Sequence, residues 1–376
     1  MFERPAGRDR ALVVALDVDG ERRTGRREEI AALAASAGAT VVGELGGHRA
    51  RPDPALFAGR GKVEEIADRR RESAADVVIF DHALSGVQQR NLERALECRV
   101  VDRTSLILDI FAQRARSAEG KLQVELAQLS HMATRLVGGW THLERQKGGI
   151  GLRGPGETQL ETDRRLITQR VKLLRERLRR VATRRSTQNR ARHRADLRTV
   201  ALIGYTNAGK STLFNRLTGA RVYAADQLFA TLDTTLRRAH APGARSLVLS
   251  DTVGFIHDLP HDLVAAFAAT LAEAGDADLL LHVIDASAHD RDEQVAAVLR
   301  LLAEIGASDV PRIRVFNKCD LAGLDAGIER DGCGNIGTVR VSAATGAGVD
   351  LLRTALAERF PLDSNVHATS TSAQTG

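Results

Sequence analysis

The middle of the chain carries glycine, lysine and serine at the spacing of a phosphate-binding loop. Residues 204–211 read GYTNAGKS, a full G-x-x-x-x-G-K-S, between the apolar run 200–203 and a helical segment. Strand, loop and helix in this order are the context that the motif needs. Its glycines let successive backbone N–H groups face a polyphosphate, Lys210 would reach the β- and γ-phosphates, and Ser211 would place its hydroxyl on Mg²⁺. A chance glycine-rich turn is the weaker interpretation, because strand and helix are both in place.

Three further short motifs follow, each at the end of an apolar strand. They are DTVG at 251–254, NKCD at 317–320 and SAA at 342–344. A carboxylate just past a strand suits contact with Mg²⁺ through a water, which is the role predicted for Asp251. Gly254 lets its N–H approach the γ-phosphate. Each tetrapeptide is weak evidence singly, but found in this order they predict a guanine-nucleotide-binding domain.

Asp320 is the residue that distinguishes guanine from adenine. Its two carboxylate oxygens can accept from the N1–H and N2 amino groups of guanine, whereas adenine presents an acceptor at N1 and would be repelled. Asn317 and the backbone near Ala343 are expected to complete the base pocket, with the stem of Lys318 against the ring.

Between the phosphate loop and DTVG, residues 229–233 (FATLD) lie in a polar stretch and predict a mobile switch. The predicted GTP-binding residues, from this switch and from the four motifs, are Gly204, Tyr205, Thr206, Asn207, Ala208, Gly209, Lys210, Ser211, Thr212, Phe229, Ala230, Thr231, Leu232, Asp233, Asp251, Thr252, Val253, Gly254, Asn317, Lys318, Cys319, Asp320, Ser342, Ala343 and Ala344.

The residue after DTVG is Phe255, where many GTPases have a glutamine that orients the attacking water. Phenylalanine neither donates nor accepts a hydrogen bond, so no catalytic residue is assigned, and Lys210 contributes phosphate electrostatics only. We expect slow intrinsic hydrolysis and an external partner that completes the site.

Asn207, within the phosphate loop, leaves two interpretations open. Its amide oxygen could help to hold a monovalent cation such as K⁺ near the phosphates. The other interpretation, slightly favoured, is an ordinary loop-stabilising asparagine.

Composition describes a soluble globular protein of two or three domains. The chain has 376 residues, of which 43% are apolar and 27% charged, and its N-terminus lacks the apolar core of a signal peptide. No apolar run approaches the ~20 residues needed to cross a bilayer. Cys98, Cys319 and Cys333 lack metal-ligand spacing, so a reduced cytoplasm is expected.

The net charge of +6 is unevenly distributed. Residues 161–198 hold fourteen Lys or Arg against four Asp or Glu, a net of +10, which leaves about −4 for the rest. Such a block is either a solvated helix face or an electrostatic footprint for nucleic acid.

The N-terminal hundred residues alternate strands with helices, which predicts an α/β domain with a mostly parallel sheet. The expected strands are 11–17, 39–44, 76–80 and 99–102, and the expected helices are 26–37, 62–72 and 85–96. Gly59-Arg-Gly-Lys62 is too short for a phosphate loop and predicts a turn that caps a helix.

Two apolar stripes at helical spacing then predict an antiparallel helical hairpin. They are Leu122, Leu126, Leu129, Ala133 and Leu136, and Leu160, Ile167, Val171, Leu174, Leu178 and Val181, with Arg164 at the missing step. The break between them holds Gly138-Gly139-Trp140 and a basic glycine-rich loop at 147–156. That loop is either the phosphate-contacting tip of the arm or a flexible connection, and Trp140 either stacks on a base or fills the end of the hairpin.

The chain resembles the HflX family of ribosome-associated GTPases, a translation-factor-related P-loop group. The most specific stretches are EGKLQVELAQ at 119–128 and GPGETQLE at 154–161, besides GYTNAGKS, FATLD and DTVGF, and the likeness spans about residues 10–361. It implies docking of the N-terminal domain and arm on the large ribosomal subunit, against ribosomal RNA near the peptidyl-transferase centre. It also implies ribosome-stimulated, Mg²⁺-dependent GTP hydrolysis and dissociation of stalled or idle ribosomes. The family's Mg²⁺ ligands correspond to Ser211 and Thr231.

The chain departs from the family pattern in two places. Residues 234–237 read TTLR where the family usually has PTTR, so a stiffening proline is absent. A small C-terminal domain that many relatives carry is not recognisable after the last expected helix, 349–360.

Four segments are therefore predicted. They are an α/β domain (1–103), a basic helical hairpin (104–198), a Ras-like GTPase domain with a mostly parallel six-stranded sheet (199–361) and a disordered polar tail (362–376). The leading function is that of a cytoplasmic, monomeric GTPase that splits ribosomes. The rivals are a nucleotide-gated RNA-binding module and a GTPase that assists RNA modification.

Overall fold

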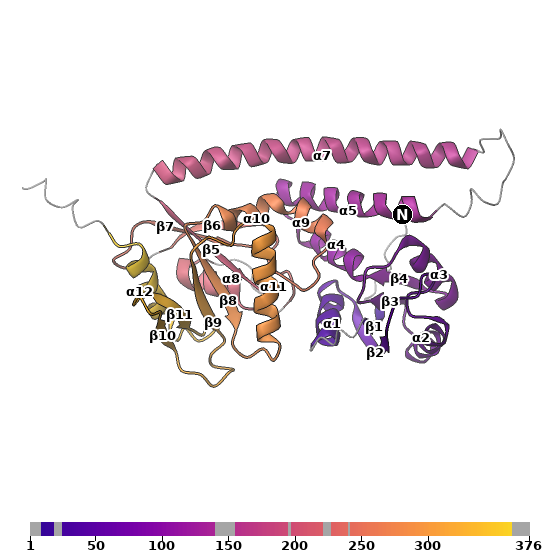
Figure 1. The fold of residues 1–376 in the computed structure, drawn as a ribbon, viewed down its shortest axis with the longest axis horizontal. Coiled ribbons are helices and arrows are strands. Elements are labelled where there is room, and N and C mark those ends of the chain that lie inside the picture. Colours follow the sequence, from indigo (N-terminus) through magenta and orange to yellow (C-terminus); the bar gives the residue numbers. More distant parts are fainter. Residues whose placement is uncertain are drawn as a thin grey trace, which may run out of the picture. The chain divides into compact units, whose positions relative to one another are not determined.

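The computed structural model (Figure 1) describes residues 9–18, 25–139, 155–194, 197–220, 227–239 and 241–362. Most of the predicted arm tip, at 140–154, and the tail from 363 onward lie outside the described residues. The chain forms two compact units. Unit 1 comprises Met1–Val181, Gln227–Phe229 and Asp258–Phe267, and unit 2 comprises Ala182–Asp226, Ala230–His257 and Ala268–Gly376. The four-segment division drawn from the sequence stays a prediction.

Unit 1 begins with a parallel sheet of four strands in the order β2-β1-β3-β4. The strands are β1 (Arg10–Val18), β2 (Thr40–Arg49), β3 (Val77–Phe80) and β4 (Arg99–Asp102), and the helices between them are α1 (Arg26–Ser36), α2 (Arg60–Ser73) and α3 (Gly86–Leu96). Helices α1 and α4 (Arg103–Arg114) contact each other, as do α2 and α3, so that the two pairs cover the sheet. The predicted α/β fold is confirmed, with β2 longer than expected.

Local chemistry explains where these helices begin. The Ser85 hydroxyl accepts from the N–H of Gln88 while the Gln88 side chain accepts from the N–H of Ser85, a capping box at the start of α3. Asp102 caps α4 by accepting from the N–H of Ser105. Gly59 precedes α2 with φ 81°, which agrees with the predicted capping turn.

A buried charge cluster lies where β3 and β4 end. Asp81 accepts from the Nη1 atom of Arg103 at 2.6 Å and also from Arg26, and Arg103 pairs with Glu29. Asp81 and Arg103 are only 2% and 4% exposed. Burial opposes the charged form of Arg103, but the carboxylates of Glu29 and Asp81 outweigh it and raise the Arg103 pKa. The cluster is therefore a set of mutually neutralising charges held out of water.

Two long helices follow, α5 (Ala118–Gly139) and α7 (Pro155–Arg194). Figure 1 shows α7 running back alongside α5, and Arg170 is paired with Glu125 at 2.6 Å. Within the two predicted apolar stripes, Leu126 and Leu174 are buried, whereas Arg164 is exposed. Helix α5 extends through Gly138 and Gly139, which the sequence had placed in the break. Among the described residues, no helix combines the length and apolar character that a bilayer crossing requires.

Unit 2 is built on a sheet of seven strands, not the predicted six, in the order β10-β11-β9-β8-β5-β7-β6. They are β5 (Arg198–Gly204), β6 (Thr235–Ala239), β7 (Leu247–Asp251), β8 (Leu279–Asp285), β9 (Arg312–Asn317), β10 (Gly327–Arg330) and β11 (Ile336–Arg340). The inner pairings are parallel, as predicted, and the two edge pairings, β6–β7 and β10–β11, are antiparallel. The edge strands are charged and only partly buried, so they lack the apolar runs that reveal the inner strands.

Four helices pack on this sheet. They are α8 (Lys210–Thr218), α10 (Ala268–Gly275), α11 (Arg291–Glu304) and α12 (Val349–Arg359). Helices α8 and α12 contact each other over the main core, in which Phe214, Leu352 and Leu356 meet the strands. Helix α9 (His261–Ala266) belongs to unit 1 and contacts α5. The predicted P-loop fold is confirmed.

Candidate nucleotide-binding site

The phosphate loop connects β5 to α8, and two of its glycines are required by geometry. Gly204 has φ 152°, and a Cβ there would lie 2.1 Å from the carbonyl oxygen of Val283. Gly209 has φ 90°, precedes α8, and a Cβ there would lie 2.2 Å from the Nδ2 atom of Asn317. Any side chain would therefore displace the loop. The N-terminus of α8 is left facing the space in which phosphates are predicted to bind.

Lys210 is folded back over the loop. Its Nζ atom donates to the carbonyl oxygens of Gly204 at 3.0 Å and Tyr205 at 2.7 Å, and the residue is 6% exposed. Burial lowers the Lys210 pKa to about 8, against the opposing effect of Asp251. An ammonium held beside a helix N-terminus favours an anion, and a bound polyphosphate would raise the Lys210 pKa again.

Three oxygen-bearing side chains converge at the start of α8. The Ser211 hydroxyl donates to the Oδ2 atom of Asp251 at 2.7 Å and lies 2.7 Å from the Thr231 hydroxyl. The Oδ1 atom of Asp251 is buried without a hydrogen-bond partner. Burial raises the Asp251 pKa, and the Ser211 hydrogen bond and Lys210 oppose that rise. Hard oxygen donors beside an unsatisfied carboxylate oxygen fit Mg²⁺. Ser211 and Thr231 would be its ligands, with Asp251 acting through water.

The DTVGF segment lies directly against the phosphate loop. The N–H of Thr206 donates to the carbonyl of Phe255 at 2.7 Å, and the N–H of Phe255 donates to the carbonyl of Gly204 at 3.1 Å. A Cβ on Gly254 would lie 2.8 Å from Thr206 and 3.1 Å from the Nζ atom of Lys210. Gly254 is thus the residue that allows this close approach. The Phe255 side chain is 1% exposed.

Asn317 ties three loops together. Its Nδ2 atom donates to the carbonyl of Ala208 at 2.8 Å, and its Oδ1 atom accepts from the N–H of Ala343 at 2.9 Å. Both polar atoms of the amide are engaged, so Asn317 positions the loops, and its contact with the base stays a prediction. Lys318 pairs with Asp285 at 2.7 Å, and Asp320 is exposed. The Asp320 carboxylate is therefore available to a guanine base.

The remaining predicted residues are distributed as follows. Thr252 donates to the carbonyl of Leu202 at 2.6 Å inside the core, and Asn207 is exposed with φ 60°. Phe229 belongs to unit 1, and its ring packs against Phe111. A direct contact of each predicted residue with GTP stays a prediction.

Sequence reasoning missed two residues that support the site. Asp285 ends strand β8 and pairs with Lys318, and a carboxylate at the end of an apolar strand was the available signal. Arg216 of α8 donates to the carbonyl oxygens of Ala343 and Ala344. No sequence pattern links Arg216 to residues so far along the chain.

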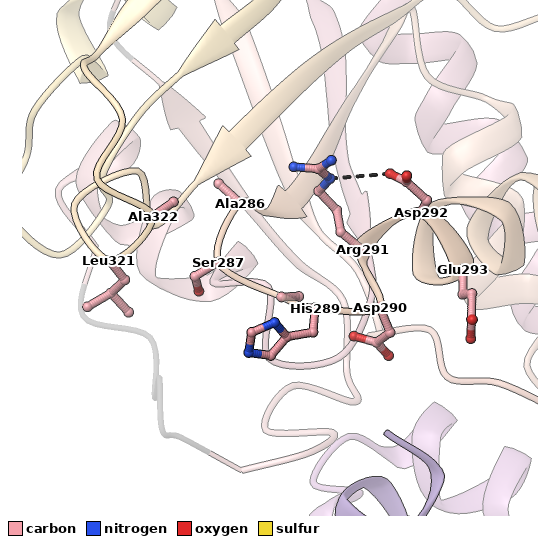
Figure 2. Close-up of a pocket in the computed structure, with 10 residues that line it drawn as sticks. Ala286, Ser287, His289, Asp290, Arg291, Asp292, Glu293, Leu321 and Ala322 are labelled. Carbon is pink, nitrogen blue, oxygen red and sulfur yellow. Dashed lines mark hydrogen bonds and ion pairs between the residues drawn. The ribbon is translucent and has the colours of Figure 1, made fainter. Parts of the chain in front are cut away.

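A cavity of about 500 Å³ lies beside the NKCD motif (Figure 2). It is lined by residues 286–293 and by Leu321 and Ala322, which follow Asp320 in the chain. Figure 2 shows Arg291 turned toward Asp292, and the two are paired at 3.3 Å. None of these lining residues belongs to the predicted GTP-binding set.

Comparison with known proteins agrees with this geometry. Three family models match in succession: GTP-binding GTPase N-terminal over residues 25–112, GTP-binding GTPase Middle Region over 114–192, and 50S ribosome-binding GTPase over 199–318. The GTPase HflX of Escherichia coli (strain K12) is 56% identical over 361 residues, which cover 96% of this chain and 85% of that protein. The chain belongs to the HflX family of GTPases.

Other comparisons fit the same family. The GTPase HflX of Caldanaerobacter subterraneus subsp. tengcongensis is 47% identical over 356 residues, covering 95% of this chain and 82% of that protein. The crystal structure of SsGBP in complex with GDP aligns with a TM-score of 0.51 at 24% identity, covering 93% of this chain and 98% of that one, which shows a shared fold. The resemblance to the HflX family predicted from the sequence is confirmed.

The position of Asp320 gives a first test of base choice in this HflX-family GTPase. We expect Asp320→Asn to weaken GTP binding by roughly 1–3 kcal/mol, because the amide cannot accept both guanine N–H groups. Xanthosine triphosphate should bind the variant better than GTP does, since the 2-oxo group of xanthine accepts from the new amide. Direct titration with GTP and with xanthosine triphosphate measures this change in base preference. Asp350→Asn, an exposed carboxylate of α12, is the control, and unchanged GTP affinity in Asp320→Asn would exclude Asp320 from the pocket.

Proposed function

We propose that this GTPase binds the large ribosomal subunit and dissociates stalled or idle ribosomes, with GTP hydrolysis coupled to its release. It is proposed to act as a monomer in the cytoplasm. The name of the family model matched by residues 199–318, a 50S ribosome-binding GTPase, supports this partner. The observation that carries the proposal is the exposed basic surface of α7.

Helix α7 carries many exposed cationic side chains between residues 164 and 184. Its exposed cationic residues are Arg164, Arg165, Arg170, Lys172, Arg175, Arg177, Arg179, Arg180 and Arg184. Forty residues at 1.5 Å per residue make a rod of roughly 60 Å, which is long enough to follow several phosphates of an RNA backbone. A rigid array of arginines matches phosphate oxygens better than a flexible basic tail, because less conformational freedom is lost on binding.

In this proposal the ribosome activates GTP hydrolysis. Phe255 is buried and apolar where a water-orienting side chain would stand, so this chain's motif supplies no polar group at that position. GTP hydrolysis by the isolated protein is accordingly slow in this proposal, and contact with the ribosome completes the site.

A bound Mg²⁺ would neutralise charge on the β- and γ-phosphates. Ser211 and Thr231 would hold the ion, and Asp251 would orient one of its waters. Asn207 is the residue proposed for a K⁺ contact, if the protein uses a monovalent cation.

The second candidate function is a nucleotide-gated RNA-binding module in which hydrolysis only ends the bound state. The buried apolar Phe255 favours this alternative, because binding alone needs no water-orienting group. A GTPase that assists an RNA-modifying enzyme is a weaker rival, since the family match extends through the middle region of the chain.

Sedimentation of purified ribosomes separates these functions. We expect free subunits to accumulate with GTP and with a non-hydrolysable analogue, but not with GDP. GTP turnover should rise when large subunits are added. Splitting by the analogue with no stimulation of turnover would favour the gated module. An unchanged profile with every nucleotide, together with equal turnover, would refute the proposed function.

A further inference from the structure

One hydroxyl of the phosphate loop is buried without a hydrogen-bond partner. It belongs to Thr206, which is 5% exposed, and within the described part of the chain no group forms a hydrogen bond with its Oγ1 atom. An unpaired buried hydroxyl costs stability, so such an atom in a folded protein calls for a ligand or an ordered water. Thr206, Lys210 and the DTVGF motif all belong to unit 2, so this neighbourhood lies within one compact unit.

The Thr206 side chain lies beside the groups that are predicted to bind the γ-phosphate. A Cβ placed on Gly254 would be 2.8 Å from the Thr206 Cγ2 atom and 3.1 Å from the Lys210 Nζ atom. The methyl group and the ammonium therefore border the same small volume next to Gly254. The Thr206 hydroxyl is bonded to the same carbon atom as that methyl group, so it shares this neighbourhood. Lys210 and the Gly254 N–H are the contacts expected for a γ-phosphate.

Backbone and ring contacts fix the position of Thr206. Its N–H donates to the carbonyl of Phe255 at 2.7 Å, and the N–H of Phe255 donates to the carbonyl of Gly204 at 3.1 Å. The Tyr205 hydroxyl accepts from the N–H of His257 at 3.0 Å, and the rings of these two residues lie 5.2 Å apart. The loop and the DTVGF segment are thus joined on both sides of Thr206. A hydroxyl that is held in place before its ligand arrives loses little freedom on binding.

The chemistry around the hydroxyl favours an anionic oxygen as its partner. A threonine hydroxyl can donate or accept, but the Lys210 ammonium and the N-terminus of α8 both attract negative charge. A hydrogen bond to a charged acceptor is also stronger than one between neutral groups. The apolar Phe255 cannot donate to such an oxygen, so Thr206 supplies a polar group that the residue after DTVG lacks.

We propose that the Thr206 hydroxyl donates a hydrogen bond to a non-bridging oxygen of the γ-phosphate of GTP. The inference rests on the phosphate site predicted for this GTPase and does not depend on the ribosomal partner. GDP has no γ-phosphate, so this contact forms with GTP alone. Thr206 is therefore a residue that determines the preference for GTP over GDP. The phosphate-loop motif accepts any residue at this position, so the motif itself gives no sign of the role.

The test compares a non-hydrolysable GTP analogue with GDP in direct titrations of the full chain with Mg²⁺. In Thr206→Val, which keeps the shape and removes the hydroxyl, affinity for the analogue should fall about 10- to 100-fold, the effect of one hydrogen bond to a charged group. GDP affinity should stay unchanged, because GDP lacks the γ-phosphate. Thr206→Ser keeps the hydroxyl and should retain most of the preference for the analogue.

Thermal unfolding without nucleotide separates this role from a structural one. Removing an unpaired buried hydroxyl relieves a desolvation cost, so Thr206→Val should unfold at the same temperature as the parent protein or higher. Thr338→Val is the matched control, because Thr338 is a buried threonine of β11, which β8 and β9 separate from β5. This control should keep the ratio of analogue affinity to GDP affinity.

Equal weakening of both nucleotides by Thr206→Val, or no weakening of the analogue, would overturn the proposed contact. A lower unfolding temperature with an unchanged affinity ratio would assign Thr206 to the fold alone. Lys210→Ala tests the phosphate site itself. If Lys210→Ala keeps its affinity for both nucleotides, the predicted phosphate site is wrong and the Thr206 contact fails with it. If Lys210→Ala weakens both and Thr206→Val weakens neither, the site stands and only the role of Thr206 fails.

Discussion

Reversing the charge of Arg177, Arg180 and Arg184 to glutamate is expected to weaken ribosome binding by roughly 100-fold at 0.1 M salt. Each lost phosphate contact removes about 0.7–0.9 from the slope of log affinity against log salt, so the slope should flatten by about 2–3. All three side chains are exposed on α7, and Arg180 pairs with Glu176 at 2.6 Å along the helix. Their loss should therefore leave the fold intact. Equilibrium binding over a series of salt concentrations measures both quantities.

A matched variant distinguishes a specific face from net charge. Arg300, Arg312 and Arg314 are also exposed, and reversing them changes the protein's charge by the same amount. That variant should keep nearly the parental affinity, and both variants should keep GTP affinity. If the α7 variant retains its affinity and salt slope, the basic face is merely solvated, and only the family relationship supports a ribosomal partner.

The second large effect is expected from the buried charge cluster of unit 1. Asp81→Ala should lower the free energy of unfolding by roughly 3–5 kcal/mol, because it leaves the guanidinium groups of Arg26 and Arg103 buried with too little negative charge. Glu29 still pairs with Arg103 in this variant, so the cluster keeps part of its negative charge. Against a typical total of about 5–15 kcal/mol, this change threatens the fold at physiological temperature. Urea denaturation measures it.

Exposed ion pairs give the contrast. Asp68 pairs with Arg71 at 3.0 Å, and both side chains are more than half exposed, so Asp68→Ala should cost about 0–1 kcal/mol. Asp81→Asn, which retains shape and loses charge, should fall between the two. In all three variants the urea concentration at the midpoint of unfolding should fall, and the dependence of the unfolding free energy on urea concentration should stay the same. A loss for Asp81→Ala no larger than that for Asp68→Ala would show that the buried cluster contributes little.

The sequence predicted the nucleotide motifs and the strands that carry them because those signals are local. An apolar run such as 200–203 identifies a strand buried on both faces, and GYTNAGKS identifies the turn that follows it. The parallel strands then bring Ser211 and Asp251 to one edge of the sheet, where they are hydrogen-bonded. The same logic predicted the capping turn at Gly59.

Features that depend on distant residues were not accessible in this way. The Asn317 amide donates to the carbonyl of Ala208, 109 residues earlier in the chain, and accepts from the N–H of Ala343, 26 residues later. Strands β6 and β10 are stabilised by their partners and not by apolar runs of their own. The packing of Phe229 on Phe111 joins residues that no periodicity connects. Each of these features depends on tertiary contacts, which local sequence patterns do not show.

The interleaving of the two units limits how this protein can be dissected. After residue 182 the chain returns to unit 1 twice, at 227–229 and at 258–267. A fragment that begins with the GTPase motifs would carry Phe229 and Phe267 without Phe111, and these rings would be exposed to water. Exposed apolar patches of this kind promote self-association. Most domains can be moved between proteins by cutting one exposed linker, but here no single cut in the chain separates the two units.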